Sequence, residues 1–367
     1  MSIYFNVIPD DHERLRFDES YRQYGDGVIY ILRDQATLSF PKLFARYPRT
    51  RFILFNPPVQ PWISQAYGIH FRDRGYDTKN HSLEGIRELR LDSCFKLTAI
   101  PLFKSLVRLT VEHCIDITEI GGFTRLQQLK LCNCPFLAEI HELPALQYCI
   151  FDNCPSIEDL SVLLNVKGVT LKNCRLVTDV RPLALAEKII IDNCPNVVDV
   201  TALAAIPHLE LTNCCNLRDI SVLNQVRSLS VNGCGFVEIL PSPNIIENFS
   251  GVGLYRLVDL RPLRHAREVD LSHCNSLINL RGLENCEKVT LKSCECLRDV
   301  SVVKNAREVD LSFCPNLRDV SYLFRVKKLN LAYCDGIVGI YNLRYVPQLD
   351  LTGYCGTESC PRWLPKK

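Results

Sequence analysis

The chain lacks any long apolar segment. None of its apolar runs reaches about 18 residues, whereas a membrane-spanning helix needs roughly 20. We therefore expect no membrane span. The first residues, Met1 to Asn6, also lack the basic stretch and the apolar stretch that make up a secretion signal. Both features favour an intracellular protein, cytoplasmic or nuclear.

The chain also has little net charge. Its 43 Lys and Arg residues and 41 Asp and Glu residues leave a formal charge of +2. A domain that binds nucleic acid normally carries a clear excess of basic residues on one face. We therefore expect no nucleic-acid partner.

Motifs for catalysis or cofactor binding are missing as well. The eight histidines are scattered, and the glycines match no phosphate-binding pattern. Cys355 and Cys360 have the spacing of one half of a zinc site but no second pair. We therefore expect a protein that is not an enzyme, with no catalytic residue, cofactor, metal site or small-molecule substrate.

Cysteine is absent from residues 1–93 but abundant afterwards, and its spacing is regular. The chain holds 19 cysteines, of which twelve lie on one 20-residue progression, with Leu254 and Tyr354 at its two remaining positions. The twelve are Cys94, Cys114, Cys134, Cys154, Cys174, Cys194, Cys214, Cys234, Cys274, Cys294, Cys314 and Cys334. A fixed period of this length indicates a stack of repeated supersecondary units. Buried free thiols at this density favour a reducing compartment.

Each repeat reads L-x-x-L-x-L-x-x-C-x-x-L-x-D-V-x-x-L-x-x. The L-x-L part alternates apolar and polar residues, which predicts a short strand with one buried face. After the cysteine, apolar residues recur at every third position, as at Leu317, Val320 and Leu323. This spacing predicts a one-turn or 3₁₀-like segment on the return path.

The pattern L-x-x-L-x-L-x-x-C-x-x-L resembles the signature of leucine-rich-repeat proteins, in the cysteine-containing class. The resemblance implies an α/β solenoid: a leucine-rich-repeat horseshoe with a parallel β-sheet on the concave face and short turns or 3₁₀ segments on the convex face. It covers about fourteen repeats over residues 82–367, with a C-terminal cap around Arg362 to Leu364. It also implies a binding function, since the family shares a mode of binding and not a reaction.

Residues 1–81 do not follow the repeat. Strands are expected over residues 27–32, 51–55 and 68–71, and a helix over residues 38–47. We interpret this segment as an irregular N-terminal cap or as degenerate repeats, with an independent domain as the alternative. An F-box, the adaptor-binding element of some leucine-rich-repeat receptors, is not recognisable here.

An acidic ladder follows the cysteines. Its members are Glu119, Glu139, Asp159, Asp179, Asp199, Asp219, Asp259, Asp299 and Asp319. Stacked carboxylates are a feature of Ca²⁺ sites, but each of these residues precedes the same short turn. We therefore interpret them as caps for the free N–H groups of that turn.

Two groups of residues are candidate partner-binding sites on the concave face. The first combines large apolar residues with flanking charges, and it comprises Tyr148, Ile150, Asp152, Lys172, Ile190 and Asp192. The second is the aromatic pair Phe313 and Tyr333, which lie one repeat apart. Apolar anchors rimmed by charges are typical of interface hot spots, although isolated exposed apolar residues are normal on any protein surface.

These features favour a non-enzymatic intracellular scaffold that binds another protein through its concave sheet. Two alternatives remain. One is a substrate receptor of a ubiquitin ligase, with its adaptor segment in residues 1–81. The other is a structural subunit of a large assembly.

Overall fold

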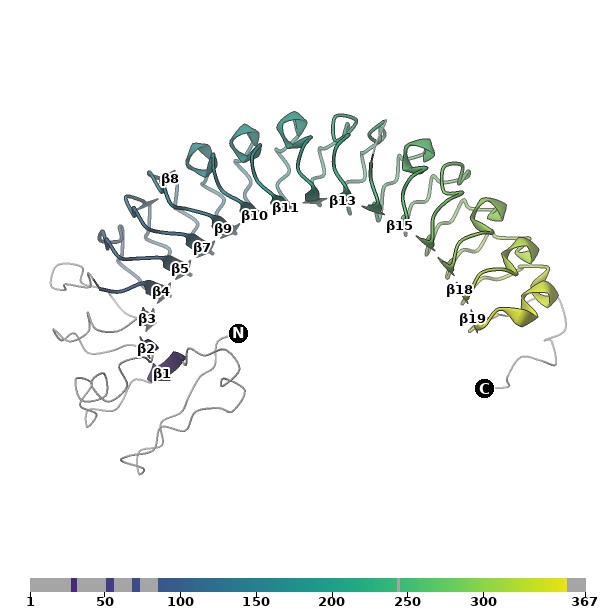
Figure 1. Ribbon diagram of the computed structural model, residues 1–367, viewed down its shortest axis with the longest axis horizontal. Coiled ribbons are helices and arrows are strands. Elements are labelled where there is room, and N and C mark those ends of the chain that lie inside the picture. The colour runs from purple at the N-terminus through teal and green to yellow at the C-terminus, as the bar shows by residue number, and fades with distance from the viewer. Residues whose placement is uncertain (1–27, 32–50, 56–67, 73–84, 243–244, 355–367) are drawn as a thin grey trace, which may run out of the picture. The chain divides into compact units, whose positions relative to one another are not determined.

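The computed structural model describes residues 28–31, 51–55, 68–72, 85–242 and 245–354. The chain divides into two compact units, residues 1–176 and residues 177–367. In each unit parallel strands lie side by side along the concave side, and short 3₁₀ segments occupy the opposite side (Figure 1). Each unit is thus a leucine-rich-repeat solenoid with one strand per repeat.

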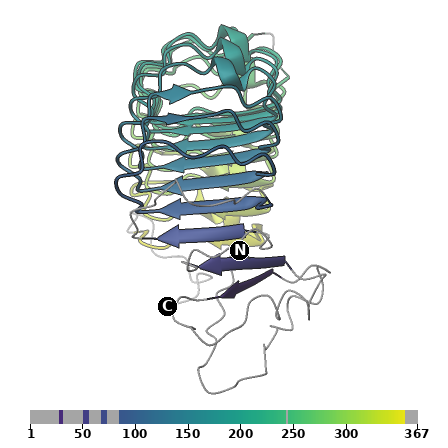
Figure 2. The ribbon, with the colours of Figure 1, turned by 90° about the vertical axis from the view of Figure 1, so that its left-hand side faces the viewer.

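In unit 1 the strands of the main sheet run parallel to one another (Figure 2). Its main sheet pairs each strand with the next along the chain, and a second sheet joins the two-residue strands β6 and β8. Its elements are β1 (Val28–Ile31), β2 (Arg51–Phe55), β3 (Gly68–Arg72), β4 (Glu88–Asp92), β5 (Arg108–Glu112), β6 (Glu119–Ile120), β7 (Gln128–Cys132), β8 (Glu139–Ile140), β9 (Tyr148–Asp152), η4 (Ser161–Leu163) and β10 (Gly168–Lys172).

Unit 2 repeats the same plan, with shorter strands after β12. Consecutive strands again pair in parallel, offset by 20 residues, as in Val289↔Val309 and Val309↔Leu329. Its elements are η5 (Arg181–Leu183), β11 (Lys188–Asp192), η6 (Thr201–Leu203), β12 (His208–Thr212), β13 (Ser228–Ser230), β14 (Asn248–Ser250), η7 (Arg261–Leu263), β15 (Glu268–Asp270), β16 (Lys288–Thr290), η8 (Ser301–Val303), β17 (Glu308–Asp310), η9 (Ser321–Leu323), β18 (Lys328–Asn330), η10 (Ile340–Tyr345) and β19 (Gln348–Asp350).

The strands expected near the N-terminus are present as β1, β2 and β3, and β3 pairs in parallel with β4 of the first regular repeat. The helix expected over residues 38–47 lies outside the described residues, as does the cap expected around Arg362 to Leu364. Among the residues that the structure describes, no helix is long and apolar enough to cross a membrane.

The predicted cysteine ladder is confirmed. All twelve side chains are fully buried free thiols. Most of the thiols donate to a backbone carbonyl 23 residues earlier, as Cys314 does to Leu291 O at 3.1 Å and Cys334 to Leu311 O at 2.9 Å. A small side chain with a weak S–H donor suits this position because it fills the core and satisfies a carbonyl of the preceding turn.

The predicted turn caps are confirmed for the aspartates. Asp159 Oδ1 accepts a hydrogen bond from the Ser161 backbone N–H at 2.7 Å, where η4 begins. The same bond, two residues along the chain, is formed by Asp179, Asp199, Asp219, Asp259, Asp299 and Asp319. Most of these bonds open a 3₁₀ segment, as the three-residue apolar spacing predicts. Glu119 and Glu139 differ, because they lie in β6 and β8.

Candidate functional site

One backbone position has a left-handed conformation throughout the repeats. The residue directly before each ladder position has a φ between 52° and 72°, or slightly above at two glycines. These residues are Ser93, His113, Asn133, Asn153, Asn173, Asn193, Asn213, Gly233, Gly253, His273, Ser293, Phe313, Tyr333 and Gly353. Asparagine and glycine tolerate this conformation best, which explains their frequency in the set. We call this position the left-handed slot.

Phe313 and Tyr333 occupy two neighbouring slots in unit 2. Their φ angles are 60° and 57°, and the two residues are 44% and 50% exposed. The rings stack, with centroids 4.6 Å apart and an interplanar angle of 15°. The Lys292 ammonium lies 5.3 Å from the centre of the Phe313 ring, within the range of a cation–π interaction. The aromatic stack therefore presents half-exposed rings with a cation beside them.

A bulky residue in the left-handed region is costly. For residues with a Cβ the cost is roughly 1–2 kcal/mol. The backbone nevertheless holds both residues there, because Phe313 N donates to Ala332 O at 2.9 Å and Tyr333 N donates to Thr352 O at 2.7 Å. Strained positions that carry exposed aromatic side chains are candidates for function, since the fold itself does not require the aromatic ring.

The next left-handed slot holds a glycine, Gly353, which leaves space for the Tyr333 ring. Gly353 has a φ of 73°, and a Cβ placed on it would lie 2.5 Å from Cδ1 of Tyr333. The missing side chain thus lets the Tyr333 ring lie over the backbone of the following repeat. The strand residues that precede the two slots are polar: Asp310 Oδ1 accepts from Ser312 N at 2.9 Å and Asp310 Oδ2 accepts from Asn330 Nδ2 at 3.2 Å.

The first predicted group is divided between the two units. In unit 1, Tyr148 and Ile150 are exposed on β9, at 48% and 38%, while Asp152 and Lys172 are half-buried and adjacent in register on β9 and β10. In unit 2, Ile190 and Asp192 are half-buried on β11. Large apolar side chains therefore do point out of the strands at Tyr148 and Ile150, and the role of this group stays a prediction.

A charged network on the strands of unit 1 was not anticipated from the sequence. Glu112 accepts hydrogen bonds from Arg90 and from Lys130, the latter with a Nζ–Oε1 distance of 2.7 Å. Burial raises the pKa of Glu112, but the bond from Lys130 and the charge of Arg90 outweigh it, so that its pKa is lowered. Burial, aided by the charge of Arg90, lowers the pKa of His70 on β3 to about 4. The histidine at position 70, within the strand expected over residues 68–71, is the sequence feature that could have pointed to a buried ionisable group here.

Four ladder thiols of unit 2 are poor nucleophiles. Burial raises the pKa of Cys274 and of Cys334 to about 11, and that of Cys294 and of Cys314 to about 12. A nucleophilic cysteine needs the opposite, an accessible thiolate near neutral pH. These four buried thiols of unit 2 therefore have a structural role.

Comparison with known proteins gives distant likenesses. No family model and no curated protein matches the chain. An internalin from Listeria monocytogenes is 15% identical, over 80% of this chain and 82% of that one, with a TM-score of 0.40. A leucine-rich-repeat protein from Leptospira interrogans is 15% identical, over 80% of each chain, with a TM-score of 0.41. The InlJ functional domain from Listeria monocytogenes, which includes a cysteine ladder, is 11% identical over 77% of this chain and 67% of that one, with a TM-score of 0.39.

The class of the protein follows from its own repeats. The 20-residue sequence period, the one strand per repeat and the buried cysteine ladder together make it a leucine-rich-repeat solenoid.

Proposed function

We propose that the protein is a non-enzymatic intracellular scaffold that binds another protein through its strand surface, with the Phe313–Tyr333 stack as the anchor. The observation that carries this proposal is the pair of half-exposed aromatic rings in strained left-handed slots, where other repeats have Asn, Ser, His or Gly. Tyr is among the residues that are enriched in the hot spots of protein interfaces.

The residues around the stack indicate which side chains a partner would present. The two rings offer apolar area that is already ordered by stacking, so little side-chain entropy is lost on binding. Lys292 is exposed beside them and attracts a carboxylate. A matching partner presents an apolar or aromatic side chain next to an acidic one. The free thiols, including the exposed Cys215 and Cys296, support a reducing intracellular setting.

Site-specific cross-linking tests the proposal. A photoreactive phenylalanine analogue is placed at position 333, or as a control at Tyr322, which is 47% exposed on η9. Each protein is cross-linked in lysate from its native cell, and the cross-linked sites are identified by mass spectrometry. We expect one protein to be cross-linked specifically at position 333. In a separate experiment without the photoreactive residue, we expect that protein to co-purify with the native chain and not with the double variant Phe313→Asn and Tyr333→Asn.

Each outcome decides between the hypotheses. Equal cross-linking from positions 322 and 333 would contradict an anchor at the stack. Capture of ubiquitin-ligase subunits that depends on residues 1–81 and not on the stack would favour the receptor alternative. Stoichiometric recovery of the chain in a large particle, unaffected by both substitutions, would favour the assembly-subunit alternative. Loss of one specific partner only in the double variant would support the scaffold.

A further inference from the structure

Two glutamates face each other on the small second sheet of unit 1. Strands β6 and β8 pair in parallel, with Glu119 directly opposite Glu139 and Ile120 opposite Ile140. Two like charges directly opposite each other on neighbouring strands destabilise the pairing. Some compensating positive group is therefore expected at this point.

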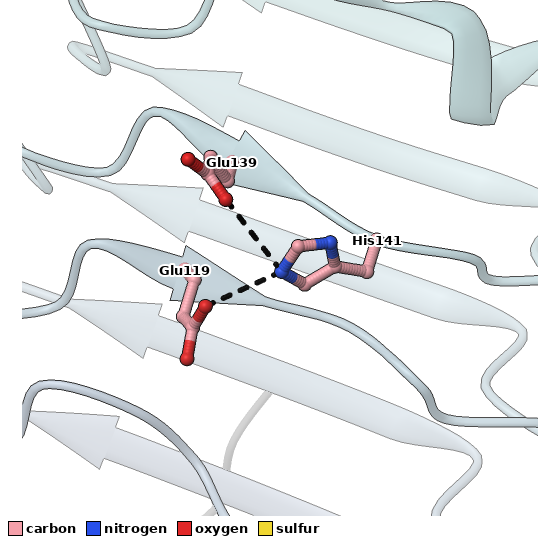
Figure 3. Close-up of side chains that lie close together, drawn as sticks. All are labelled: Glu119, Glu139 and His141. Carbon is pink, nitrogen blue, oxygen red and sulfur yellow. Dashed lines mark hydrogen bonds and ion pairs between the residues drawn. The ribbon is translucent and has the colours of Figure 1, made fainter.

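The two glutamates depart from the pattern of the other repeats. At the equivalent position Asp159 and the later aspartates turn back on their own chain and accept from the N–H group two residues on. The longer side chains of Glu119 and Glu139 instead reach one imidazole, that of His141 (Figure 3). Where other repeats have a capping Asp, these two repeats have Glu, and the two glutamates form a cluster with His141 instead of capping their turns.

His141 places a single nitrogen atom between the two carboxylates. Its Nε2 lies 3.3 Å from Glu119 Oε2 and 3.8 Å from Glu139 Oε2. One Nε2–H group can form only one good hydrogen bond, so it cannot satisfy both carboxylates. The backbone of His141 is fixed, because its N–H donates to Ile120 O at 2.8 Å.

Gly121 makes the approach of His141 possible. A Cβ on Gly121 would collide with the Cβ of His141 and would lie 2.7 Å from its Cα. Any other residue at position 121 would push the His141 backbone away from β6. The cluster is thus built from four residues in two successive repeats, three that supply polar atoms and one that leaves space.

The distances match a tetrahedral ion. Zinc binds His nitrogen and carboxylate oxygen at about 2.0–2.2 Å, so two of its ligand atoms lie roughly 3.4 Å apart. One ligand atom from each of the three residues can be chosen so that all lie within 4.8 Å of one another. Small rotations of the exposed glutamate side chains bring these atoms to the required separations.

From this geometry we infer that Glu119, Glu139 and His141 bind a divalent transition-metal ion of the zinc type. The imidazole favours this class over Ca²⁺ and Mg²⁺, which prefer sites made only of oxygen ligands. The ion neutralises the paired carboxylates and links two neighbouring repeats. Three protein ligands leave a fourth position open to water or to a carboxylate from outside the chain.

Cobalt and zinc titrations of the full chain test the site. Co²⁺ reports the ligand type through its visible absorption, since thiolate ligands add an intense near-ultraviolet charge-transfer band whereas imidazole and carboxylate ligands do not. The affinity for Zn²⁺ is then obtained by competition at neutral pH. The variants are His141→Gln, Glu119→Gln and Glu139→Gln. The matched control is His113→Gln, which removes an exposed histidine that faces one carboxylate, Asp92, at 3.3 Å.

We expect one equivalent of Co²⁺ to bind without the thiolate band, and Zn²⁺ to displace it. Each of the three ligand variants should weaken the affinity by at least about tenfold, whereas His113→Gln should leave it unchanged. Equal affinity in His141→Gln and in the native chain would overturn the inference. So would a thiolate band, which would place the ion at cysteines, tighter binding of Ca²⁺ than of Zn²⁺, or no binding at all.

Discussion

Phe313 and Tyr333 stack ring on ring, with centroids 4.6 Å apart, although each has the left-handed backbone that other repeats give to Asn or Gly. The two effects oppose each other in the free energy of folding. The stack contributes about 0.5–1.5 kcal/mol, and the left-handed backbone costs about 1–2 kcal/mol per residue. The stack therefore contributes little net stability to the fold.

The double substitution Phe313→Asn and Tyr333→Asn should change the free energy of unfolding by less than about 1 kcal/mol, because relief of backbone strain offsets the lost stacking. Urea unfolding followed by circular dichroism measures this. As a control, Leu311→Ala removes a fully buried side chain in the same repeat and should cost about 2–5 kcal/mol. A comparable loss in the double variant would show that the aromatic rings serve the fold and not recognition.

Among the glycines of unit 2 that the structure describes, Gly282 should be the least tolerant of substitution. Its φ is 116°, and a Cβ there would collide with the Leu260 carbonyl and lie 2.8 Å from Arg261 Cα, which are backbone atoms that cannot move aside. We expect Gly282→Ala to lower the free energy of unfolding by about 3 kcal/mol or more. Gly253→Ala is the matched control: its φ is 74°, and its new Cβ would meet no atom closer than 3.7 Å. Similar losses in the two variants would contradict a steric cause.

Stability should fall in alkaline solution because buried ladder thiols such as Cys314 ionise more readily in the unfolded chain. Burial raises the pKa of Cys314 from 9.0 to about 12. A pKa raised in the folded state gives stability that is complete below the unfolded value and is lost as the pH rises toward the folded value. Cys314 alone should therefore cost about 1.4 kcal/mol for each pH unit between 9 and 12.

The measurement for this alkaline effect is the free energy of unfolding as a function of pH in the native chain and in Cys314→Ala. The variant should be less stable at neutral pH, since it leaves a cavity, but its stability should fall less steeply above pH 9. Parallel curves for the two proteins would mean that other groups cause the alkaline loss.

Stability should also fall in mildly acidic solution because of His70. Burial and the charge of Arg90 lower its pKa from 6.5 to about 4, so between these values the unfolded chain binds a proton that the folded chain does not. The stability present above pH 6.5 is lost as the pH falls toward 4, by up to roughly 3 kcal/mol. Unfolding at pH 4.5–7 in the native chain and in His70→Gln isolates this effect. Equal slopes in the two proteins would mean that another group causes the acidic loss.

The fold could be predicted because its main determinants are buried and periodic. Leu317, Val320 and Leu323 indicate a turn by spacing alone, and Cys314 marks the repeat because only a small apolar group fits its place in the core. The 20-residue period likewise places Phe313 beside Tyr333. The Asn and Gly residues at many of the slot positions are the sequence signal for a positive φ, but Phe313 and Tyr333 themselves give no such signal.

The cluster around His141 depends on features that the repeat pattern does not contain. By sequence alone Glu119 and Glu139 belong to the same ladder as the capping aspartates, and His141 is one of several scattered histidines. Their meeting requires the extra methylene of glutamate, the pairing of β6 with β8, and the space left by Gly121. These are local properties of two repeats, and a consensus averaged over all repeats conceals them.

Most ladder thiols donate a hydrogen bond to a carbonyl 23 residues earlier, one repeat plus three positions. A gene segment encoding 20 residues can therefore be duplicated or lost while these thiols still meet the carbonyl of the turn before them. An insertion of one residue within a strand instead turns its apolar side chains toward solvent. Gain or loss of whole repeats should therefore disturb the core less than small insertions do. Related chains should differ in length by multiples of 20 residues.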